Sequence, residues 1–247
     1  PYAHARRKTR RTEFADLGVG GGDPVRVELN VSDFVSGISL DDVAGPLAES
    51  LARVEGVECE SLLIGLDGKF TVRDVESFRA ALDREGLQIP LSVRVKAGLL
   101  DGEVHFPSGC ARWVVEVGSG ESVGALKKAC RAVFDSAMGV EWCFRADLPV
   151  IPGLVDRVIE AMAENSLPEV AFSVESEGAV HGARLLAALL DAKGMGECPI
   201  VLRHVFSRTE DAELGLIESS IALGAPLCDG IGDMISVGGV GSPEKLL

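Results

Sequence analysis

Two kinds of segment alternate repeatedly along this chain. Eight short runs rich in Val, Ile or Leu alternate with longer amphipathic stretches along 247 residues. This alternation is typical of parallel α/β folds, in which helices cover strands that are buried on both faces. The predicted strands are Val25–Leu29, Ser61–Leu66, Leu91–Lys96, Trp113–Val117, Met138–Phe144, Glu169–Val174, Ile200–Val205 and Asp233–Val237.

The amphipathic stretches between these runs predict helices. Four leucines between positions 185 and 190 form an apolar stripe at helical spacing. Gly86 and Gly194 follow two of the stretches and predict glycine C-caps, because glycine readily adopts the left-handed conformation that ends many helices. The predicted helices are 41–55, 72–85, 122–135, 153–164, 179–192 and 210–223.

Eight strands with intervening helices favour one closed TIM-type (β/α)8 barrel, because about 250 residues is the typical size of that fold. An open doubly wound sheet is the alternative. Residues 24–240 contain no linker, and residues 24–247 are interpreted as a single barrel domain. Residues 1–23 are interpreted as a basic, glycine-rich arm that leads into it.

The charge balance restricts the partners of the chain. With 24 Lys plus Arg against 38 Asp plus Glu, the net charge is −14, which opposes binding to nucleic acid, an anionic membrane or an unassisted anionic substrate. No apolar run reaches the ~18 residues of a membrane span, and no apolar signal segment follows the start. We therefore predict a soluble protein without nucleic-acid or membrane partners.

The six cysteines stand far apart, with no C-x-x-C pair. This spacing indicates neither a disulfide scaffold nor a zinc or iron–sulfur site built from this chain alone. We expect free, mostly buried thiols in a reducing compartment, and no cofactor in this chain. The cysteines are Cys59, Cys110, Cys130, Cys143, Cys198 and Cys228.

Two features near the N-terminus have a functional and a structural interpretation. The basic run at residues 6–11 could grip a phosphate or an acidic partner, but a solvated arm is favoured. The glycines of residues 18–22 could wrap a phosphate, yet no strand precedes them and no G-K-[ST] follows, which disfavours a nucleotide loop.

Three polar features lie near predicted strand ends. The glycines and aspartates of residues 229–233 fit a tight turn before the last strand, a structural role. Glu175 and Glu177 follow a strand where barrel enzymes place their chemistry, although a solvated loop is the simpler interpretation. His204, beside Arg203, is ambiguous in the same way, and the histidines show no spacing typical of metal ligands.

Two strings at opposite ends of the chain indicate a family. Near the start stand R-R-K-T-R at residues 6–10 and G-G-G-D-P-V-R-V at 20–27, and near the end stands L-C-D-G-I-G-D-M-I at 227–235. They resemble R-R-K-T-R, G-G-x-x-P-I-x-V and L-L-x-D-G-I-G-D-T-I of the 4-hydroxy-3-methylbut-2-enyl diphosphate synthases of the non-mevalonate (MEP) isoprenoid pathway. The resemblance spans residues 6–237 and implies a dihydropteroate-synthase-like (β/α)8 barrel.

Several polar site positions of that family carry different residues here. Arg94 and Lys96 stand where the family motif A-D-V-H-F has Asp and His. Glu116 and Glu175 replace an arginine and a lysine, and Glu141 replaces an asparagine. Two further arginine positions carry Leu63 and Ser236. The positions aligned with the family site, and hence the candidate binding residues, are Arg94, Lys96, Glu116, Glu141, Glu175 and His204.

These replacements imply that the diphosphate clamp of the family is lost. A diphosphate needs Arg and Lys donors, so replacing them by Glu, Leu and Ser removes attraction and is expected to add repulsion at the strand ends. No residue of this chain is therefore assigned a catalytic role. The family's 4Fe–4S domain, with its C-x-x-C ligands, has no counterpart in this sequence.

The resemblance is strongest to the second barrel that is inserted in three-domain plant and bacterial members of the family. Its motifs H-A-A-R-R-L, F-P-V-I-H-H and G-G-L-L-V-D-G-L-G-D match residues 177–190, 198–206 and 225–233. The leading hypothesis is a non-catalytic spacer or interaction barrel. Its implied partners are the catalytic barrel and Fe–S domain of the same enzyme, a second copy in a homodimer, and flavodoxin or ferredoxin as electron donor of the complete enzyme. The implied compartment is the bacterial cytoplasm, or the plastid in a photosynthetic eukaryote.

Two alternatives stay open. A diverged catalytic barrel would reduce 2-C-methyl-D-erythritol 2,4-cyclodiphosphate once an Fe–S domain is supplied. A recruited barrel enzyme would instead use Glu116, Glu141, Glu175 and Lys96 as a carboxylate-rich metal site.

Overall fold

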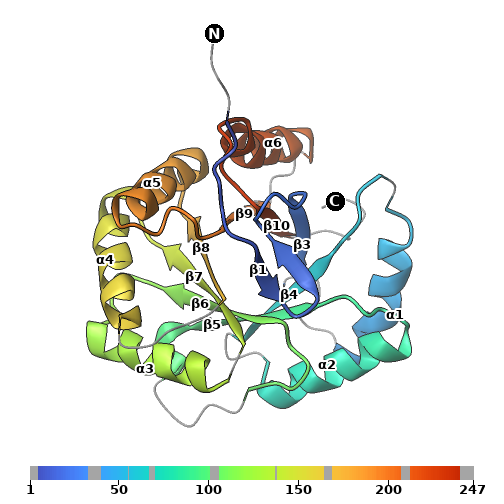
Figure 1. Cartoon of the computed structure of the whole chain (residues 1–247). Helices are drawn as coiled ribbons and strands as arrows, with labels where there is room; N and C mark the ends of the chain where they lie inside the picture. Colours follow the sequence, from blue (N-terminus) through green and yellow to red (C-terminus); the bar gives the residue numbers. More distant parts are fainter. Residues whose placement is uncertain are drawn as a thin grey trace.

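Eight parallel strands close into a barrel in the computed structural model (Figure 1). The structure describes residues 5–32, 40–54, 56–66, 70–100, 106–136, 138–163, 169–206 and 212–239. Each strand pairs with the next along the chain, and β10 pairs with both β9 and β3 to close the ring. The strands are β3 (Arg26–Asn30), β4 (Ser61–Leu66), β5 (Leu91–Lys96), β6 (Arg112–Val117), β7 (Gly139–Arg145), β8 (Val170–Glu175), β9 (Ile200–Phe206) and β10 (Met234–Gly239).

The barrel prediction is therefore confirmed, and the open sheet is wrong. Each predicted strand overlaps an observed one, and the bounds predicted for β4 and β5 are identical to those observed. The differences elsewhere are one or two residues at strand ends, where polar residues such as Arg112 and Glu175 still belong to the ladder. Apolar patterning places strand ends only approximately, because a polar residue at the end of an apolar run fits either a strand or a loop.

Six α-helices alternate with the strands in the described part of the chain. Two begin at side-chain caps, since Thr71 and Ser122 each accept a hydrogen bond from a backbone N–H of the first turn. Predicted positions 55, 164, 210 and 211 lie outside the described residues. The helices are α1 (Leu40–Leu51), α2 (Val72–Arg84), α3 (Val123–Asp135), α4 (Ile151–Met162), α5 (Ala179–Ala192) and α6 (Ala212–Cys228).

The sequence predicts the glycine C-caps of two helices correctly and the end of a third incorrectly. Gly86 and Gly194 have positive φ angles just beyond α2 and α5, as predicted for glycine C-caps. Helix α6 instead continues to Cys228, past the predicted end at residue 223, and includes Pro226. Pro226 has no backbone N–H, so the helix loses one hydrogen bond at this position. The residue is tolerated because it lies in the final turn, and the helix ends two residues later. Between β5 and β6 the described connection holds a short 3-10 helix, η1 (Ala97–Leu100).

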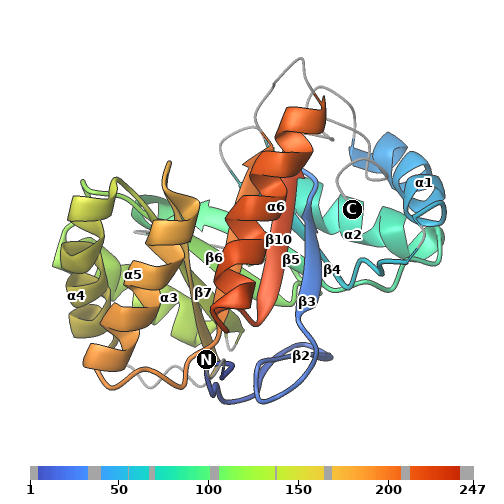
Figure 2. The same ribbon diagram turned by 90° about the horizontal axis from the view of Figure 1, so that it is seen from above.

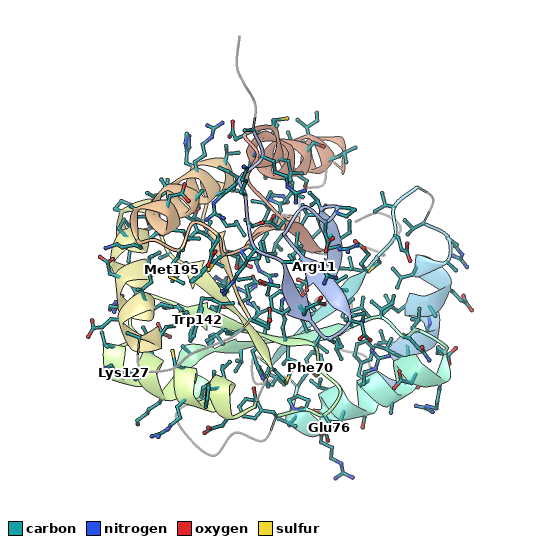
Figure 3. All side chains as sticks on the ribbon, viewed as in Figure 1. Arg11, Phe70, Glu76, Lys127, Trp142 and Met195 are labelled. Carbon is teal, nitrogen blue, oxygen red and sulfur yellow. The ribbon has the colours of Figure 1, made fainter. Side chains whose placement is uncertain are left out.

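The two faces of the barrel strands differ in polarity. Outward residues such as Trp113, Trp142 and Phe172 are fully buried beneath the helices and form the main hydrophobic core. Inward residues include the buried charged side chains Glu28 and Arg112. Figure 3 shows side chains filling the space inside the ring of strands. Because alternate residues of a strand face opposite sides, each strand contributes both to the apolar core and to a polar interior.

A short antiparallel hairpin, β1 (Thr12–Phe14) with β2 (Leu17–Val19), closes the amino-terminal end of the barrel. Figure 1 shows it across the centre of the ring, and Figure 2 shows it at one end. Phe14 is fully buried and packs in a cluster with Ala171, Val201 and Met234 from three barrel strands. Apolar patterning does not predict this hairpin, because three-residue strands show no measurable alternation.

The basic run preceding the hairpin is held against the barrel. Arg7 donates to the carbonyl oxygen of Cys198 at 2.7 Å, and its side chain is 11% exposed. Arg6 and Thr9 both donate to the carboxylate of Asp233, at 3.3 and 2.8 Å. The interpretation of the run as a solvated arm is therefore wrong for these residues, because their polar groups satisfy acceptors at the strand starts.

Asp233 explains the turn before β10. Its second carboxylate oxygen accepts the backbone N–H of Ile200 at 3.0 Å, and its carbonyl accepts the N–H of Arg26 at 3.1 Å. Gly232, with φ of 118°, lets the chain pass close to Leu202. The structural interpretation of residues 229–233 is thus confirmed. The glycines of residues 18–22 likewise serve the turn out of the hairpin, where a side chain on Gly20 would meet the carbonyl of Arg10.

Candidate functional site

The centre of the barrel contains a buried network of two arginines and two glutamates, which we call the central cluster: Glu28, Arg112, Glu141 and Arg203. Arg203 donates to both carboxylate oxygens of Glu141, at 2.6 and 2.7 Å, and to Glu28 at 3.3 Å. Arg112 contacts Glu28 at 2.6 Å and Glu141 at 3.0 Å. Each carboxylate therefore contacts both cations, and the central cluster carries no net charge.

Neighbouring groups satisfy more of the hydrogen-bonding capacity of the central cluster. Ser236 accepts a hydrogen bond from Arg203 at 2.8 Å, and the guanidinium of Arg112 lies 5.0 Å from the ring centre of Phe14. Burial by itself would raise the pKa of Glu141, but the charges of Arg203 and Arg112 outweigh it and lower that pKa to about 2. Glu141 is therefore ionised at neutral pH despite complete burial.

A second network lies at the carboxyl ends of the strands, and we call it the mouth cluster: Arg94, Glu116, Arg145 and Glu175. Arg94 donates to both oxygens of Glu175, at 2.6 and 2.7 Å. It also donates to Glu116 at 2.8 and 3.1 Å, and Arg145 reaches the same Glu116 oxygen at 3.4 Å. The bidentate pairing with Glu175 has the fork geometry of strong arginine–carboxylate contacts.

Electrostatics in the mouth cluster favour the charged forms. Burial opposes ionisation of Glu175, but hydrogen bonds from Arg94 and its charge lower the pKa of this carboxyl below its ordinary value. The side chains of Arg94, Glu116 and Glu175 are only 12 to 17% exposed. The expected repulsion at Glu116 and Glu175 is therefore wrong, because both carboxylates pair with Arg94 from another strand.

The structure brings four of the six candidate residues into these networks and leaves two outside. Arg94, Glu116 and Glu175 form most of the mouth cluster, and Glu141 lies below in the central cluster. Lys96 is exposed at the end of β5 and forms no ion pair with the described residues. His204 follows Arg203 along β9 and so faces the opposite side of the sheet, toward α6. Burial lowers the pKa of His204, while Glu218 of α6 acts to raise it.

A pocket of about 990 Å³ opens beside the mouth cluster, between the ends of β7 to β9 and helices α5 and α6. Its polar side chains include Asp147, Glu177, His204 and Glu218, and Ile221 of α6 supplies an apolar wall. The pocket is therefore offset from the barrel axis toward the helices.

The donor groups do not fit a metal or an iron–sulfur cluster. Glu116 and Glu175 share Arg94, whereas Glu141 is enclosed by other arginines, so the carboxylates do not converge on one point. Across the part of the chain that the structure describes, no three His, Cys, Asp or Glu side chains are placed to hold a metal ion. The six cysteines are free and separate. This geometry speaks against the metal-enzyme alternative and against a 4Fe–4S cluster built from these cysteines.

Two members of the central cluster, Glu28 and Arg112, were not among the candidate residues. A signal for them was present, because each shares one face of its strand with another charged residue, while the alternate residues on the other face are apolar. The same period of two links Arg112 to Glu116, and Glu141 to Arg145. Polar residues at alternate positions of several strands therefore predict a charged interior, although they do not reveal which residues pair.

The family-model comparison gave no match. Individual relatives are nevertheless similar over nearly the whole chain. The chain is 24% identical to 4-hydroxy-3-methylbut-2-en-1-yl diphosphate synthase (flavodoxin) of Chlorobaculum tepidum, with 96% of this chain and 35% of the relative covered. The Leptospira interrogans protein of the same name is 26% identical, with 96% and 34% covered. This chain resembles the 4-hydroxy-3-methylbut-2-enyl diphosphate synthase family.

The (ferredoxin) form of the same enzyme from Cyanothece sp. extends the resemblance, with 24% identity over 97% of this chain and 66% of that protein. The chain thus spans about a third of the longer relatives of the diphosphate synthase family. Dihydropteroate synthases from Xanthomonas albilineans and Coxiella burnetii have similar structures, with TM-scores of 0.56 and 0.59 and identities of 19% and 12%. For each of them, 92% of both chains is covered. These structures share the barrel fold.

Proposed function

We propose that this chain is a non-catalytic barrel of the 4-hydroxy-3-methylbut-2-enyl diphosphate synthase family, acting in isoprenoid biosynthesis as a spacer or interaction domain. The observation that carries the proposal is the pairing of Arg94. Its guanidinium is engaged by both oxygens of Glu175 and by Glu116, in the region where the family's site positions align. A diphosphate would have to displace two carboxylates from this arginine before it could bind.

Charge in the rest of the mouth supports the same conclusion. Arg203 lies deeper and is bound to Glu141 and Glu28, so it presents no free donor to the opening. Among the described residues, two cations of the mouth stay exposed: Lys96 at the end of β5, and Arg145 at the end of β7, whose guanidinium contacts Glu116 at 3.4 Å. An exposed lysine and an arginine that already contacts a carboxylate are a weak anchor for a ligand with several negative charges, because phosphate recognition depends on several convergent donors.

The proposal predicts that the chain does not bind the family substrate. Calorimetric titration with 2-C-methyl-D-erythritol 2,4-cyclodiphosphate at physiological salt is expected to give no saturable binding below about 1 mM. Micromolar, saturable binding would contradict the proposal and favour the diverged catalytic barrel.

A gain-of-binding variant sharpens this test. The double substitution Glu116→Gln and Glu175→Gln removes the two carboxylates that hold Arg94, and is expected to create pyrophosphate binding with a Kd of about 0.1–1 mM. A matched control, Asp147→Asn with Glu177→Gln, removes two charges from the adjoining pocket without touching Arg94. Equal pyrophosphate affinity of the two variants would mean that the specific pairing of Arg94 does not block the mouth.

The proposed role also requires the partner domains and the electron donor of the complete enzyme. In that setting the catalytic barrel and the 4Fe–4S domain are the partners of this barrel, and flavodoxin or ferredoxin is the electron donor. Mixing the chain with an Fe–S domain and reductant is expected to give no turnover at any ratio. Turnover that depends on this chain would instead identify it as catalytic.

A further inference from the structure

Helix α6 has an unusual distribution of residue sizes between its two faces. Its buried stripe contains Gly215, Ser219 and Leu223, whereas Ile217 and Ile221 on the opposite side are 50% and 58% exposed. A surface helix ordinarily turns its large apolar residues toward the core. Figure 2 shows α6 along the outside of the barrel.

The exposed apolar residues of α6 are spaced for contact with another helix. Leu214, Ile217 and Ile221 follow one another at intervals of three and four residues, and we call this stripe the outer seam. Alternating three- and four-residue spacing places side chains in one line along a helix, where they can interlock with a facing helix. A contiguous apolar stripe of this kind is typical of an interaction surface.

Acidic residues border the outer seam. Glu218 lies beside Ile221 and lines the pocket next to the barrel mouth, as do Asp147 and Glu177. The same pocket is also lined by Arg145, which pairs with Glu116, and by His181 and His204. We call the three carboxylates Asp147, Glu177 and Glu218 the acidic rim. None of them forms a salt bridge with a basic side chain of the described residues, in contrast to the paired carboxylates inside the barrel. Helix α6 itself contains two Glu and no Lys or Arg.

We infer that the outer seam and acidic rim form a docking surface for an amphipathic helix of another domain or protein, with an apolar stripe flanked by Lys or Arg. Charge complementarity selects this occupant over a second copy, because a second α6 would bring the same acidic residues and a chain of net charge −14. The apolar stripe supplies contact area, and a basic side chain would enter the pocket toward the acidic rim. The inference depends on the proposed function only in treating this barrel as an interaction domain.

The test uses a stapled helical peptide of about four turns, with Leu at three- and four-residue intervals and Lys on both flanks. Fluorescence anisotropy with the whole chain is expected to give a Kd on the order of 10 μM. A peptide with Glu in place of each Lys is expected to bind at least about tenfold more weakly. Equal affinity for the two peptides would overturn the inference.

Substitutions locate the binding surface. Ile217→Ser with Ile221→Ser is expected to weaken binding about tenfold, whereas Leu99→Ser with Phe134→Ser, at exposed apolar residues elsewhere, leaves it unchanged. Removing the acidic rim by D147N, E177Q and E218Q is expected to weaken binding and reduce its salt dependence. The control for this triple variant is E58Q, D135N and E160Q, at other exposed carboxylates. Binding unaffected by either seam or rim substitutions would overturn the inference.

Sedimentation equilibrium tests the second copy as occupant. The chain is expected to be monomeric at micromolar concentration. A dimer that the Ile217→Ser and Ile221→Ser substitutions dissociate would overturn the inference and assign the seam to self-association. Failure of peptide binding leaves the result of the cyclodiphosphate titration unchanged, so this inference and the proposed function can fail separately.

Discussion

Glu141 illustrates how single residues stabilise the barrel interior. It is completely buried, yet its carboxylate contacts Arg203 through two hydrogen bonds and lies 3.0 Å from Arg112. Burying a charge is costly unless a partner of opposite charge compensates it, and here two cations do so. Each member of the central cluster therefore depends on the others, and removing one leaves an uncompensated charge.

Replacing Glu141 by Gln is expected to destabilise the fold by about 3 to 5 kcal/mol, because Arg203 and Arg112 would retain only Glu28 as counter-ion. Urea unfolding followed by circular dichroism measures this loss. The exposed control Glu160→Gln is expected to change stability by less than about 0.5 kcal/mol. A cost for Glu141→Gln as small as that of the control would show that the pairing contributes little.

The lowered pKa values predict how stability depends on pH. Glu141 has a pKa near 2 in the folded chain, against an ordinary value of 4.5, and Glu175 shifts in the same direction. Stability from these groups is fully present above about pH 4.5 and is lost as pH falls toward 2, because the unfolded chain takes up protons first. Thermal melts between pH 6 and 2.5 measure this loss. The Glu141→Gln variant is expected to show a shallower decline, and an identical decline would contradict the assignment.

At the scale of elements, the N-terminal hairpin and α6 show opposite behaviour. The hairpin turns Phe14 inward and closes one end of the barrel, with the basic run held against the strand starts. Helix α6 turns Ile217 and Ile221 outward. The hairpin thus completes the core, whereas α6 leaves apolar surface available at the side of the barrel.

Phe14→Ala is expected to destabilise the chain by about 3 to 5 kcal/mol, because the substitution empties a buried site and removes the ring beneath Arg112. The matched control is Phe134→Ala, since Phe134 of α3 is 49% exposed. Equilibrium denaturation of both variants measures the difference. Similar small effects for both would mean that the hairpin is not part of the cooperative fold.

At the scale of the whole molecule, the barrel encloses paired charges and single cysteines. Cys59, Cys130, Cys143 and Cys198 are buried, whereas Cys228 at the end of α6 is exposed. Burial raises the pKa of Cys59, Cys130 and Cys143 to about 12, so their thiols stay protonated and unreactive at neutral pH.

Thiol titration of the native chain with Ellman's reagent is expected to show one fast-reacting group, Cys228, and six groups after denaturation. The Cys228→Ser variant is expected to lose the fast phase. Cys110 is partly exposed, so the contradicting result is a fast reaction of Cys59, Cys130, Cys143 or Cys198 in the native chain, which would require the barrel to open readily.

Local sequence patterns predict the strands and helices of the barrel, but not the N-terminal hairpin. Apolar runs and helical stripes involve residues that are close together in the sequence, so they can be recognised without knowing the fold. The apolar runs predicted all eight barrel strands. The pairing of the charges could not be predicted, because the partners lie far apart in the sequence. Arg94 meets Glu175 across 81 positions of sequence, and Arg203 meets Glu28 across 175. Barrel closure brings these side chains together, and so Glu116 and Glu175, for which repulsion was predicted, are paired with Arg94.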